Sequence, residues 1–362
     1  MASVDLAPFV SLDDFEQHAR TVLPTVAADY FRSGAWGEVT VRENRSAWDR
    51  LRIHYRVMVD VSKRSTAATI LGQPASMPVV VAPTALHGMA HADGELASVR
   101  AAGASGVPFT LSSLSTTAVE DVCAAASGPV WMQMYIGKDR GFVRALAQRA
   151  QAAGCTALVL TVDTPVWGVR ERDLRNHFRV PDHLRIVNLE RPGGPTGHEG
   201  RGIGQSLGWT IDDTLTWKDF EWLRDATSLP VLVKGICRPE DAAQAVALGA
   251  AGVIVSNHGG RQLDSAPPTA ETLEPVAQVV AGRAAVLVDG GVRRGTDVLK
   301  ALALGATAVA VGRPVLWGLA TAGEDGVKQV LAILKQELDV SMALAGLTSV
   351  RSVPRHMVRQ AP

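Results

Sequence analysis

Residues 231–256, VLVKGICRPEDAAQAVALGAAGVIVS, carry the pattern that decides the fold. An apolar, β-branched run, Val231–Lys234, ends at a polar residue, and a second apolar run, Gly252–Ser256, follows it. Between them, Pro239–Gly249 opens with proline and two acidic residues and closes on glycine, which is typical of a helix. Continuous apolar runs are typical of strands that are covered on both faces of a parallel sheet. The stretch therefore predicts one strand–helix–strand unit.

The same unit recurs on both sides of this stretch. The apolar runs are Val79–Ala82, Phe109–Leu111, Val130–Tyr135, Ala157–Asp163, Val231–Lys234, Gly252–Ser256, Ala285–Asp289 and Ala308–Gly312. Asp139–Gly154 and Thr296–Gly305 have helical apolar spacing and end on glycine. Eight strands alternating with helices over about 240 residues match an α/β protein of the (β/α)8 TIM-barrel class. The alternative is a doubly wound open sheet, but no GxGxxG motif follows the first strand.

We expect all 362 residues to form a single domain. Residues 1–77 form an N-terminal helical cap, in which Leu12–Phe31 is the clearest helix. Residues 78–320 form the barrel. The interval 164–216 interrupts the barrel after the fourth strand, and its Gly- and Pro-rich centre predicts a long flexible loop. Residues 321–362 supply a closing C-terminal helix and a tail.

Composition excludes several classes of protein. Lys+Arg and Asp+Glu both number 36, so charge does not favour nucleic acid or an anionic membrane as a partner. Cys123, Cys155 and Cys237 offer no disulfide framework or zinc pattern, the histidines show no metal-ligand spacing, and no metal is expected. Cys155 opens an apolar run and is expected to be a small buried hydrophobe. No signal peptide or membrane span is recognisable, so we expect a cytoplasmic protein.

Polar residues gather where the predicted strands end. In a barrel these ends and the loops after them form one face, and reactive groups lie there. In strand order the residues are Pro83, Thr84 and Ala85; Ser112; Gln133 and Tyr135; Thr161, Asp163 and Arg170; Lys234; Ser256, His258 and Arg261; Asp289, Gly290, Gly291 and Arg293; and Gly312 and Arg313. The last two strands predict a phosphate site, because glycines admit a phosphate to backbone N–H groups and two arginines add charge. The alternative is a tight turn with exposed arginines.

His258 has neighbours that favour a catalytic role. Two glycines follow it, and Arg261 is three residues further on, while Arg170 offers a second guanidinium group from another strand. Two arginines can hold a carboxylate substrate while an imidazole removes a proton near neutral pH. Lys234 is either a surface lysine or, since it ends a strand, a group that stabilises a developing anion at the barrel mouth.

Taken together, these motifs resemble the FMN-dependent 2-hydroxy-acid oxidase and dehydrogenase family, which includes glycolate oxidase, lactate oxidase and mandelate dehydrogenase. The likeness extends from Asp29 and Tyr30 to the closing helix. Its most specific stretch is residues 256–264, SNHGGRQLD. Further matches are residues 82–85 (APTA), 161–165 (TVDTP), 232–235 (LVKG) and 289–295 (DGGVRRG).

The resemblance implies a role for each matching residue. His258 is the expected base and Asp163 the carboxylate that supports its imidazolium form. Tyr135 is expected to contact the substrate hydroxyl, and Lys234 to lie near flavin N1 and O2. The substrate carboxylate is expected to be held by Tyr30, Arg170 and Arg261. The residues expected to bind FMN are Pro83, Thr84, Ala85, Ser112, Gln133, Thr161, Lys234, Ser256, Asp289, Gly290, Gly291, Arg293, Gly312 and Arg313.

Two departures from the glycolate oxidases bear on the substrate. Leu114 and Gly137 stand where those enzymes carry bulky aromatic residues, and Trp167 is able to supply an aromatic wall. The resemblance therefore implies a small (S)-2-hydroxy acid with an aryl group, mandelate or 4-hydroxymandelate, in preference to glycolate or lactate, and a place in antibiotic biosynthesis. Whether the electrons leave as a hydride or through a carbanion stays open.

Three features favour O2 over another electron acceptor. No haem domain precedes the barrel, the insert is polar rather than apolar, and Ala85 matches the oxidases. The resemblance also implies a homotetramer. The alternatives are a glycolate- or lactate-type oxidase, a mandelate dehydrogenase with a non-oxygen acceptor, a type 2 isopentenyl diphosphate isomerase, a flavin-binding barrel without turnover, and a phosphate-binding lyase without flavin.

Overall fold

The computed structural model describes residues 4–190 and 211–361, and its centre is a closed barrel of eight parallel strands. The strands are β4 (Val79–Val81), β5 (Phe109–Leu111), β6 (Val130–Met134), β7 (Ala157–Thr161), β8 (Val231–Ile236), β9 (Gly252–Val255), β10 (Ala285–Val288) and β11 (Ala308–Val311). Each strand pairs with its neighbour in sequence, and β11 closes the barrel by pairing with β4. The predicted (β/α)8 barrel and its eight strands are confirmed.

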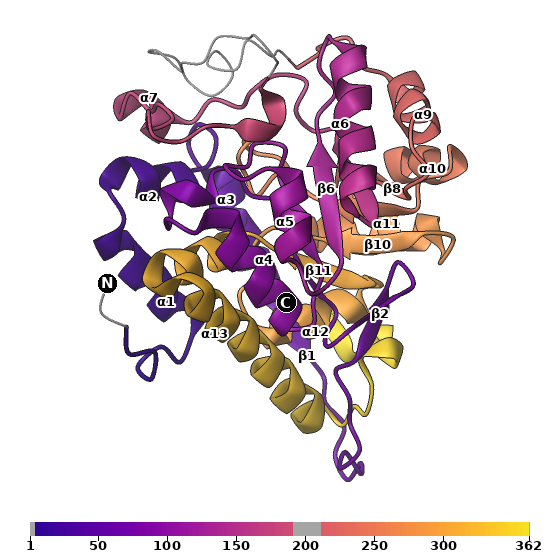
Figure 1. Cartoon of the computed structure of the whole chain (residues 1–362). Coiled ribbons are helices and arrows are strands. Elements are labelled where there is room, and N and C mark those ends of the chain that lie inside the picture. The colour runs from indigo at the N-terminus through magenta and orange to yellow at the C-terminus, as the bar shows by residue number, and fades with distance from the viewer. Residues whose placement is uncertain (1–3, 191–210, 362) are drawn as a thin grey trace.

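Helices cover the outside of the barrel (Figure 1). They are α4 (Gly94–Ala104), α5 (Val119–Ala125), α6 (Arg140–Ala153), α9 (Trp217–Asp225), α10 (Pro239–Ala247), α11 (Thr269–Val280), α12 (Gly295–Ala303) and α13 (Arg313–Ala345). The signals seen in the sequence act at the helix ends. Asp139 caps α6 by accepting a hydrogen bond from the Phe142 N–H, and Gly154 ends this helix with a left-handed φ of 99°.

The interior of the barrel is packed with apolar side chains. One buried cluster contains Val80, Trp131, Val159, Leu232, Ile254, Leu287 and Ala308 from the strands. Ile70 and Ala75 belong to the same cluster and come from a hairpin of β2 (Ala68–Ile70) and β3 (Gln73–Ala75), which precedes the barrel. The hairpin therefore closes the N-terminal end of the barrel.

The N-terminal cap contains three helices, α1 (Leu12–Val22), α2 (Thr25–Arg32) and α3 (Val39–Arg50). The expectation of one helix over Leu12–Phe31 is wrong. Leu23 has extended backbone angles because Pro24 follows it, and a residue before proline is driven out of the helical region. The break turns the chain, so that α1 packs against α13 while α2 reaches the mouth of the barrel (Figure 1).

The C-terminal part begins inside α13. Ala322 and Gly323 have non-helical angles, so α13 is two helical segments joined at a kink, and the second segment is the expected closing helix. After two short 3-10 turns, η3 (Val350–Ser352) and η4 (Arg355–Met357), the chain forms β12 (Val358–Gln360). β12 pairs antiparallel with β1 (Leu51–Ile53), which ties the tail to the cap.

The insert after β7 is described up to residue 190 and from residue 211. It contains α7 (Glu171–Arg175) and the short 3-10 turn η2 (Val187–Leu189). The Gly- and Pro-rich centre, for which a long flexible loop is predicted, lies outside the described residues. Within the described ranges no helix is both long and apolar enough to cross a membrane.

Candidate active site

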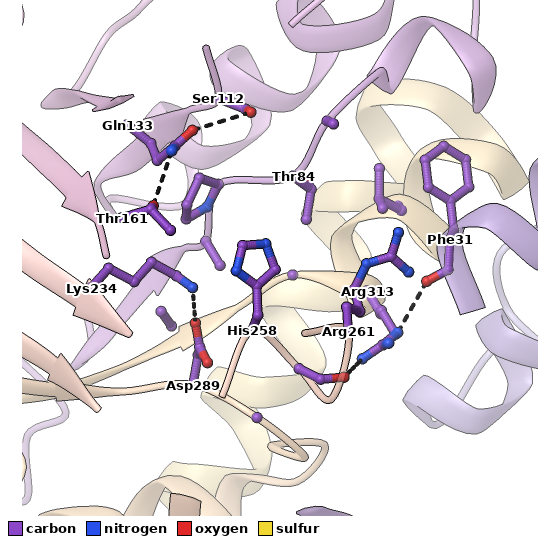
Figure 2. A pocket seen from close by; sticks show the side chains of 18 of the residues that line it. Phe31, Thr84, Ser112, Gln133, Thr161, Lys234, His258, Arg261, Asp289 and Arg313 are labelled. Carbon is purple, nitrogen blue, oxygen red and sulfur yellow. Dashed lines mark hydrogen bonds and ion pairs between the residues drawn. The ribbon is translucent and has the colours of Figure 1, made fainter. Parts of the chain in front are cut away.

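A pocket lies at the carboxyl ends of the barrel strands (Figure 2). Its empty space, counted out to open solvent, is about 1090 Å³. The predicted site residues that line it are Tyr30, Pro83, Thr84, Ala85, Ser112, Gln133, Tyr135, Thr161, Arg170, Lys234, His258, Arg261, Asp289, Gly290, Gly291, Arg293, Gly312 and Arg313. The other two, Asp163 and Ser256, lie directly behind lining residues and bond to them.

His258 and Asp163 form a half-buried pair. His258 Nδ1 lies 2.8 Å from Asp163 Oδ1, and the His258 backbone N–H donates to Ser256 Oγ at 3.0 Å. Burial raises the pKa of Asp163, but the neighbouring His258 and Lys234 outweigh it and hold this pKa below its ordinary value. An ionised Asp163 can only accept a hydrogen bond, so His258 keeps its proton on Nδ1. Nε2 is then the unprotonated nitrogen that can act as a base. His258 has a left-handed φ of 58°, and its ring stands in the centre of the pocket (Figure 2).

Lys234 supplies a buried positive charge at the floor of the pocket. Its Nζ lies 3.1 Å from Asp289 Oδ2 and donates to Ser256 Oγ at 2.9 Å. Burial lowers the pKa of Lys234, but Asp289 and Asp163 reverse the effect and raise it overall. The lysine is therefore a charged group inside the site, and its interpretation as a surface lysine is excluded.

Arg170 and Arg261 converge on Tyr30. Their guanidinium carbons lie 5.3 and 5.1 Å from the centre of the Tyr30 ring, which favours cation–π attraction. One nitrogen of Arg261, Nη1, donates to the carbonyls of Tyr30 and Ser33, both at 2.7 Å, so the rest of its fork is available to a ligand. Burial, together with Arg170, lowers the pKa of Arg261 to about 10. This pair of cations matches one carboxylate.

Arg293 and Arg313 form a second cationic region beside the ends of β10 and β11. Burial lowers the pKa of Arg293 to about 10 and that of Arg313 to about 9. Arg313 donates to the carbonyls of Phe31, Ser33 and Gly259, and Arg293 lies 4.7 Å over the Trp317 ring. Within the described ranges neither arginine forms an ion pair with a carboxylate. Both are half-buried and line the pocket, which contradicts the alternative of exposed arginines in a tight turn.

The glycines beside these arginines have a second reason to be glycine. A Cβ at Gly291 would lie 2.0 Å from the backbone oxygen of Asn44 on α3, so the loop could not approach the cap with any other residue. Gly290 has φ 94°, which also favours glycine. Close packing against the cap, as well as access to backbone N–H groups, therefore fixes this part of the predicted phosphate loop.

Gln133 anchors the opposite wall of the pocket. Its Nε2 donates to Thr161 Oγ1 at 2.9 Å, and its Oε1 accepts from the Ser113 backbone N–H at 3.2 Å and from Ser112 Oγ at 3.4 Å. These bonds join β5, β6 and β7 behind the cavity (Figure 2). The wall is therefore rigid and presents hydroxyl and amide groups to a flat polar ligand.

Leu114, Tyr135 and Trp167 form the apolar side of the pocket. The Tyr135 and Trp167 rings meet edge to face, with centres 5.6 Å apart. Burial raises the pKa of the Tyr135 hydroxyl, so this group stays protonated. Gly137 does not line the pocket; it forms a β-bridge with Ile211 instead. Since a glycine has no side chain that could line a cavity, the expectation that Gly137 enlarges the site stays a prediction.

Two residues with clear contacts in the site were not assigned a role from the sequence. Gln262 accepts from the Gly168 backbone N–H and donates to the carbonyls of Asp163 and Val166, each at 3.0 Å. It thereby connects the loop after β9 to the loop after β7. Asp173 Oδ2 lies 2.9 Å from Arg170 Nε. The i,i+3 spacing at the start of α7 indicated this ion pair. Gln262 belongs to the stretch 256–264 that carries the family resemblance, but its bonds between two loops could not be predicted from that motif.

The side chains present fit FMN. A phosphate matches Arg293 and Arg313, because it would supply a negative partner for two arginines that form no ion pair within the described residues. Asp289 Oδ1 is buried without a hydrogen-bond partner, and a ribityl hydroxyl would satisfy it. Lys234 and the Gln133 wall suit the polar edge of an isoalloxazine ring. The site therefore has a matching group for each part of the cofactor.

Comparisons with known proteins agree with this fit. The model of the FMN-dependent dehydrogenase family matches residues 19–360. Glycolate oxidase 3 of Oryza sativa subsp. indica is 48% identical over 350 residues, covering 96% of this chain and 95% of that protein. L-lactate oxidase of Nostoc sp. is 46% identical over 351 residues, covering 95% and 96%.

Solved structures show the same relationship. Mandelate oxidase with (S)-4-hydroxymandelic acid superposes with a TM-score of 0.93 at 42% identity, covering 97% of this chain and 99% of that one. Mandelate oxidase with (S)-2-phenylpropionate gives 0.89 at 42% identity, covering 97% and 99%. The chain therefore belongs to the FMN-dependent dehydrogenase family, among its 2-hydroxy-acid oxidases, and FMN is its cofactor.

Proposed function

We propose that the protein oxidises an (S)-2-hydroxy acid with an aryl group, mandelate or 4-hydroxymandelate, to the 2-oxo acid and reduces O2 to H2O2. The observation that carries this proposal is the convergence of three groups in one pocket. A histidine–carboxylate pair, a pair of arginines and an apolar wall containing Trp167 all face the same space. In an aryl 2-hydroxy acid, the carboxylate would contact the arginines, the hydroxyl-bearing carbon would face the histidine, and the aromatic ring would lie against the apolar wall.

The arrangement assigns a task to each group. Arg170 and Arg261 bind the substrate carboxylate with their free N–H groups, and the Tyr30 ring supports both cations. His258 Nε2 then takes a proton from the bound hydroxy acid. Asp163 stabilises the resulting imidazolium, since the carboxylate already accepts from Nδ1. FMN, when bound, supplies the acceptor for the two electrons.

Lys234 and Tyr135 complete the proposed machinery. The Lys234 ammonium group lies at the pocket floor and favours negative charge that develops on the cofactor side. The protonated Tyr135 hydroxyl is suited to donate a hydrogen bond to the substrate oxygen. The bonds around Gln133 and Thr161 keep the cofactor wall in place during turnover.

The aryl substrate is supported by the pocket, while sequence identity favours a second candidate. Leu114 and Trp167 form an apolar surface that an aryl substituent would cover. The methyl group of lactate or the hydrogen of glycolate would leave this surface uncovered. The glycolate and lactate oxidases, however, are 46–48% identical to this chain, against 42% for mandelate oxidase. A short-chain hydroxy acid is therefore the alternative substrate, and direct competition between substrates decides.

An anaerobic absorbance titration of the holoprotein tests the proposal. We expect (S)-mandelate and (S)-4-hydroxymandelate to bleach the flavin at lower concentrations than L-lactate and glycolate, and admission of air to restore the colour with release of peroxide. Preferential bleaching by lactate or glycolate would replace the aryl substrate. Bleaching without rapid recovery in air would replace the acceptor. Absence of bleaching by every hydroxy acid would reject the oxidase function.

A further inference from the structure

Two of the three cysteines are in contact, far from the active site. Cys123 lies on α5, and Cys155 lies in the turn between α6 and β7. Their sulfur atoms are 3.6 Å apart; Cys155 is buried and Cys123 is half-buried. The expected burial of Cys155 is thus observed, but a second thiol group is its neighbour. This contact has no part in the proposed catalysis.

The thiol pair lies at the closed end of the barrel. Cys155 precedes β7 (Ala157–Thr161), and Asp163 follows the other end of the same strand. Since a strand rises about 3.3 Å per residue, the pair is on the order of 20 Å from Asp163. A change at the sulfurs is therefore separated from the pocket by the packed interior of the barrel.

The two sulfurs differ in reactivity. The hydrogen bond with Cys155 lowers the pKa of Cys123, although burial and Glu120 oppose this effect. The same contact, together with burial, raises the pKa of Cys155 well above its ordinary value. The half-buried Cys123 is therefore the thiol that ionises first and that a small oxidant reaches, and Cys155 is placed to react with it in a second step.

We propose that Cys123 and Cys155 are a modification site at which hydrogen peroxide forms an intramolecular disulfide. The Cys123 thiolate attacks one peroxide oxygen, the O–O bond breaks, and hydroxide leaves and is protonated to water. Cys155 then attacks the sulfenic sulfur of Cys123, which forms the S–S bond and releases a second water. Two thiols and one peroxide thus give one disulfide and two waters, and the sulfurs lose two electrons. Only the source of peroxide, this protein's own turnover, rests on the proposed oxidase function.

The disulfide would join α5 to the start of β7 across a sequence separation of 32 residues. Such a cross-link restricts the unfolded chain and raises the melting temperature. Because the pocket is at the other end of the barrel, kcat and KM are expected to stay unchanged. The predicted signature is a more heat-stable protein with the same activity.

The first experiment treats reduced holoprotein with hydrogen peroxide in the absence of any hydroxy acid. We expect the protein to lose two hydrogens, to retain Cys237 as its one alkylatable thiol, and to yield a cross-linked peptide that contains Cys123 and Cys155. Cys237 is the internal control, because its thiol donates to the Ser256 carbonyl and burial raises its pKa to about 11. A melting curve and steady-state kinetics are recorded before and after oxidation.

Two variants separate the steps. Cys155→Ser should stop at a sulfenic acid on Cys123, which a dimedone-type reagent traps, and Cys123→Ser should leave Cys155 reduced. Equal oxidation of all three cysteines, or a missing cross-linked peptide, would overturn the proposal. A disulfide that leaves the melting temperature unchanged or abolishes turnover would overturn the predicted signature, a more heat-stable protein with the same activity.

A second arm separates this proposal from the oxidase function. Reduced protein is incubated with hydroxy acid in air, with and without catalase. A disulfide that forms without catalase and not with it supports both proposals. A disulfide that forms with added peroxide but never with substrate and air supports the thiol pair and rejects the protein as its own source of peroxide.

Discussion

The two ends of the barrel are built from opposite kinds of side chain. At the N-terminal end, the β2–β3 hairpin closes a buried cluster in which Ile70 and Trp131 are at most 1% exposed. At the C-terminal end, Lys234 and Arg313 lie in or beside an open pocket. The closed end therefore supplies packing energy, and the open end supplies charge. The residues that stabilise the fold and the residues that line the pocket therefore occupy separate layers of the same strands.

The open end is costly to maintain without its ligands. Burying a charge away from water is unfavourable unless partners compensate. Among the described residues, Arg261 and Arg313 donate hydrogen bonds to backbone carbonyls and form no ion pair with a carboxylate. The C-terminal turn of α2 supplies these carbonyls from Tyr30, Phe31 and Ser33, so the cap is part of the site. We infer that the pocket is held ready by the cap and is neutralised by phosphate and carboxylate when ligands bind.

His258→Ala should produce the largest change, and only at the open end. Without the proposed base, turnover is expected to fall about 10²- to 10⁴-fold, while FMN absorbance and the melting temperature stay close to the parent values. Stopped-flow flavin reduction and a melting curve measure the two effects. Near-normal reduction would remove His258 from the role of base.

Trp131→Ala should give the opposite result at the closed end. The side chain is 1% exposed inside the barrel, and its removal is expected to lower the free energy of unfolding by about 3–5 kcal/mol. In the fraction that stays folded, KM should be unchanged. Leu344→Ala, at an exposed site, is the matched control and should have little effect. A large KM change in Trp131→Ala would show that the two ends are coupled.

Arg261→Lys tests the substrate clamp. An ammonium group keeps the charge but cannot reproduce a bidentate fork, so kcat/KM is expected to fall about 10- to 100-fold. The loss should be mostly in KM, and the same factor should appear for every hydroxy acid. Arg100→Lys, on the outer surface, is the control. Unchanged kinetics in Arg261→Lys would exclude this residue from carboxylate binding.

Gln262→Met tests the connection between two loops of the open end. The variant loses all three hydrogen bonds of the side chain, and we expect kcat/KM to fall about 10-fold, since the Asp163 and Trp167 region loses its anchor. Gln151→Met is the control, because Gln151 on α6 accepts two hydrogen bonds from Thr227 and Ser228 and does not line the pocket. Equal kinetics in the two variants would assign Gln262 to stability alone.

Sequence reasoning could predict the parts of this comparison that depend on local pattern. The continuous apolar runs predicted all eight strands, and the polar residues at the strand ends predicted which side chains share a pocket. Pro24 indicates a break within Leu12–Phe31, because a residue before proline avoids the helical region. Side-chain partners set by long-range packing could not be predicted from the sequence, because the Gln262 bonds cross between two loops. The Cys123–Cys155 contact likewise depends on how α5 packs beside α6, which ends just before Cys155.

The smallest expected effect is a difference in the pH dependence of stability between two carboxylates that follow β7, Asp163 and Asp173. Burial raises the pKa of Asp173 above its ordinary 3.8, whereas His258 and Lys234 overcome burial and lower the pKa of Asp163. A lowered pKa gives stability that is present above pH 3.8 and disappears as the pH falls through the folded value. A raised pKa gives stability below pH 3.8 that disappears as the pH rises through the folded value.

Asp163→Asn and Asp173→Asn should therefore show opposite pH trends in melting temperature between about pH 3 and pH 7. The advantage of the parent over Asp163→Asn should be largest at pH 7 and shrink toward pH 3, because protonation removes the charge that His258 and Lys234 stabilise. Asp173→Asn should gain on the parent as the pH rises, because the neutral amide avoids a buried charge. Parallel trends in the two variants would contradict this prediction. They would show that the pKa values of Asp163, beside His258, and Asp173, beside Arg170, shift in the same direction.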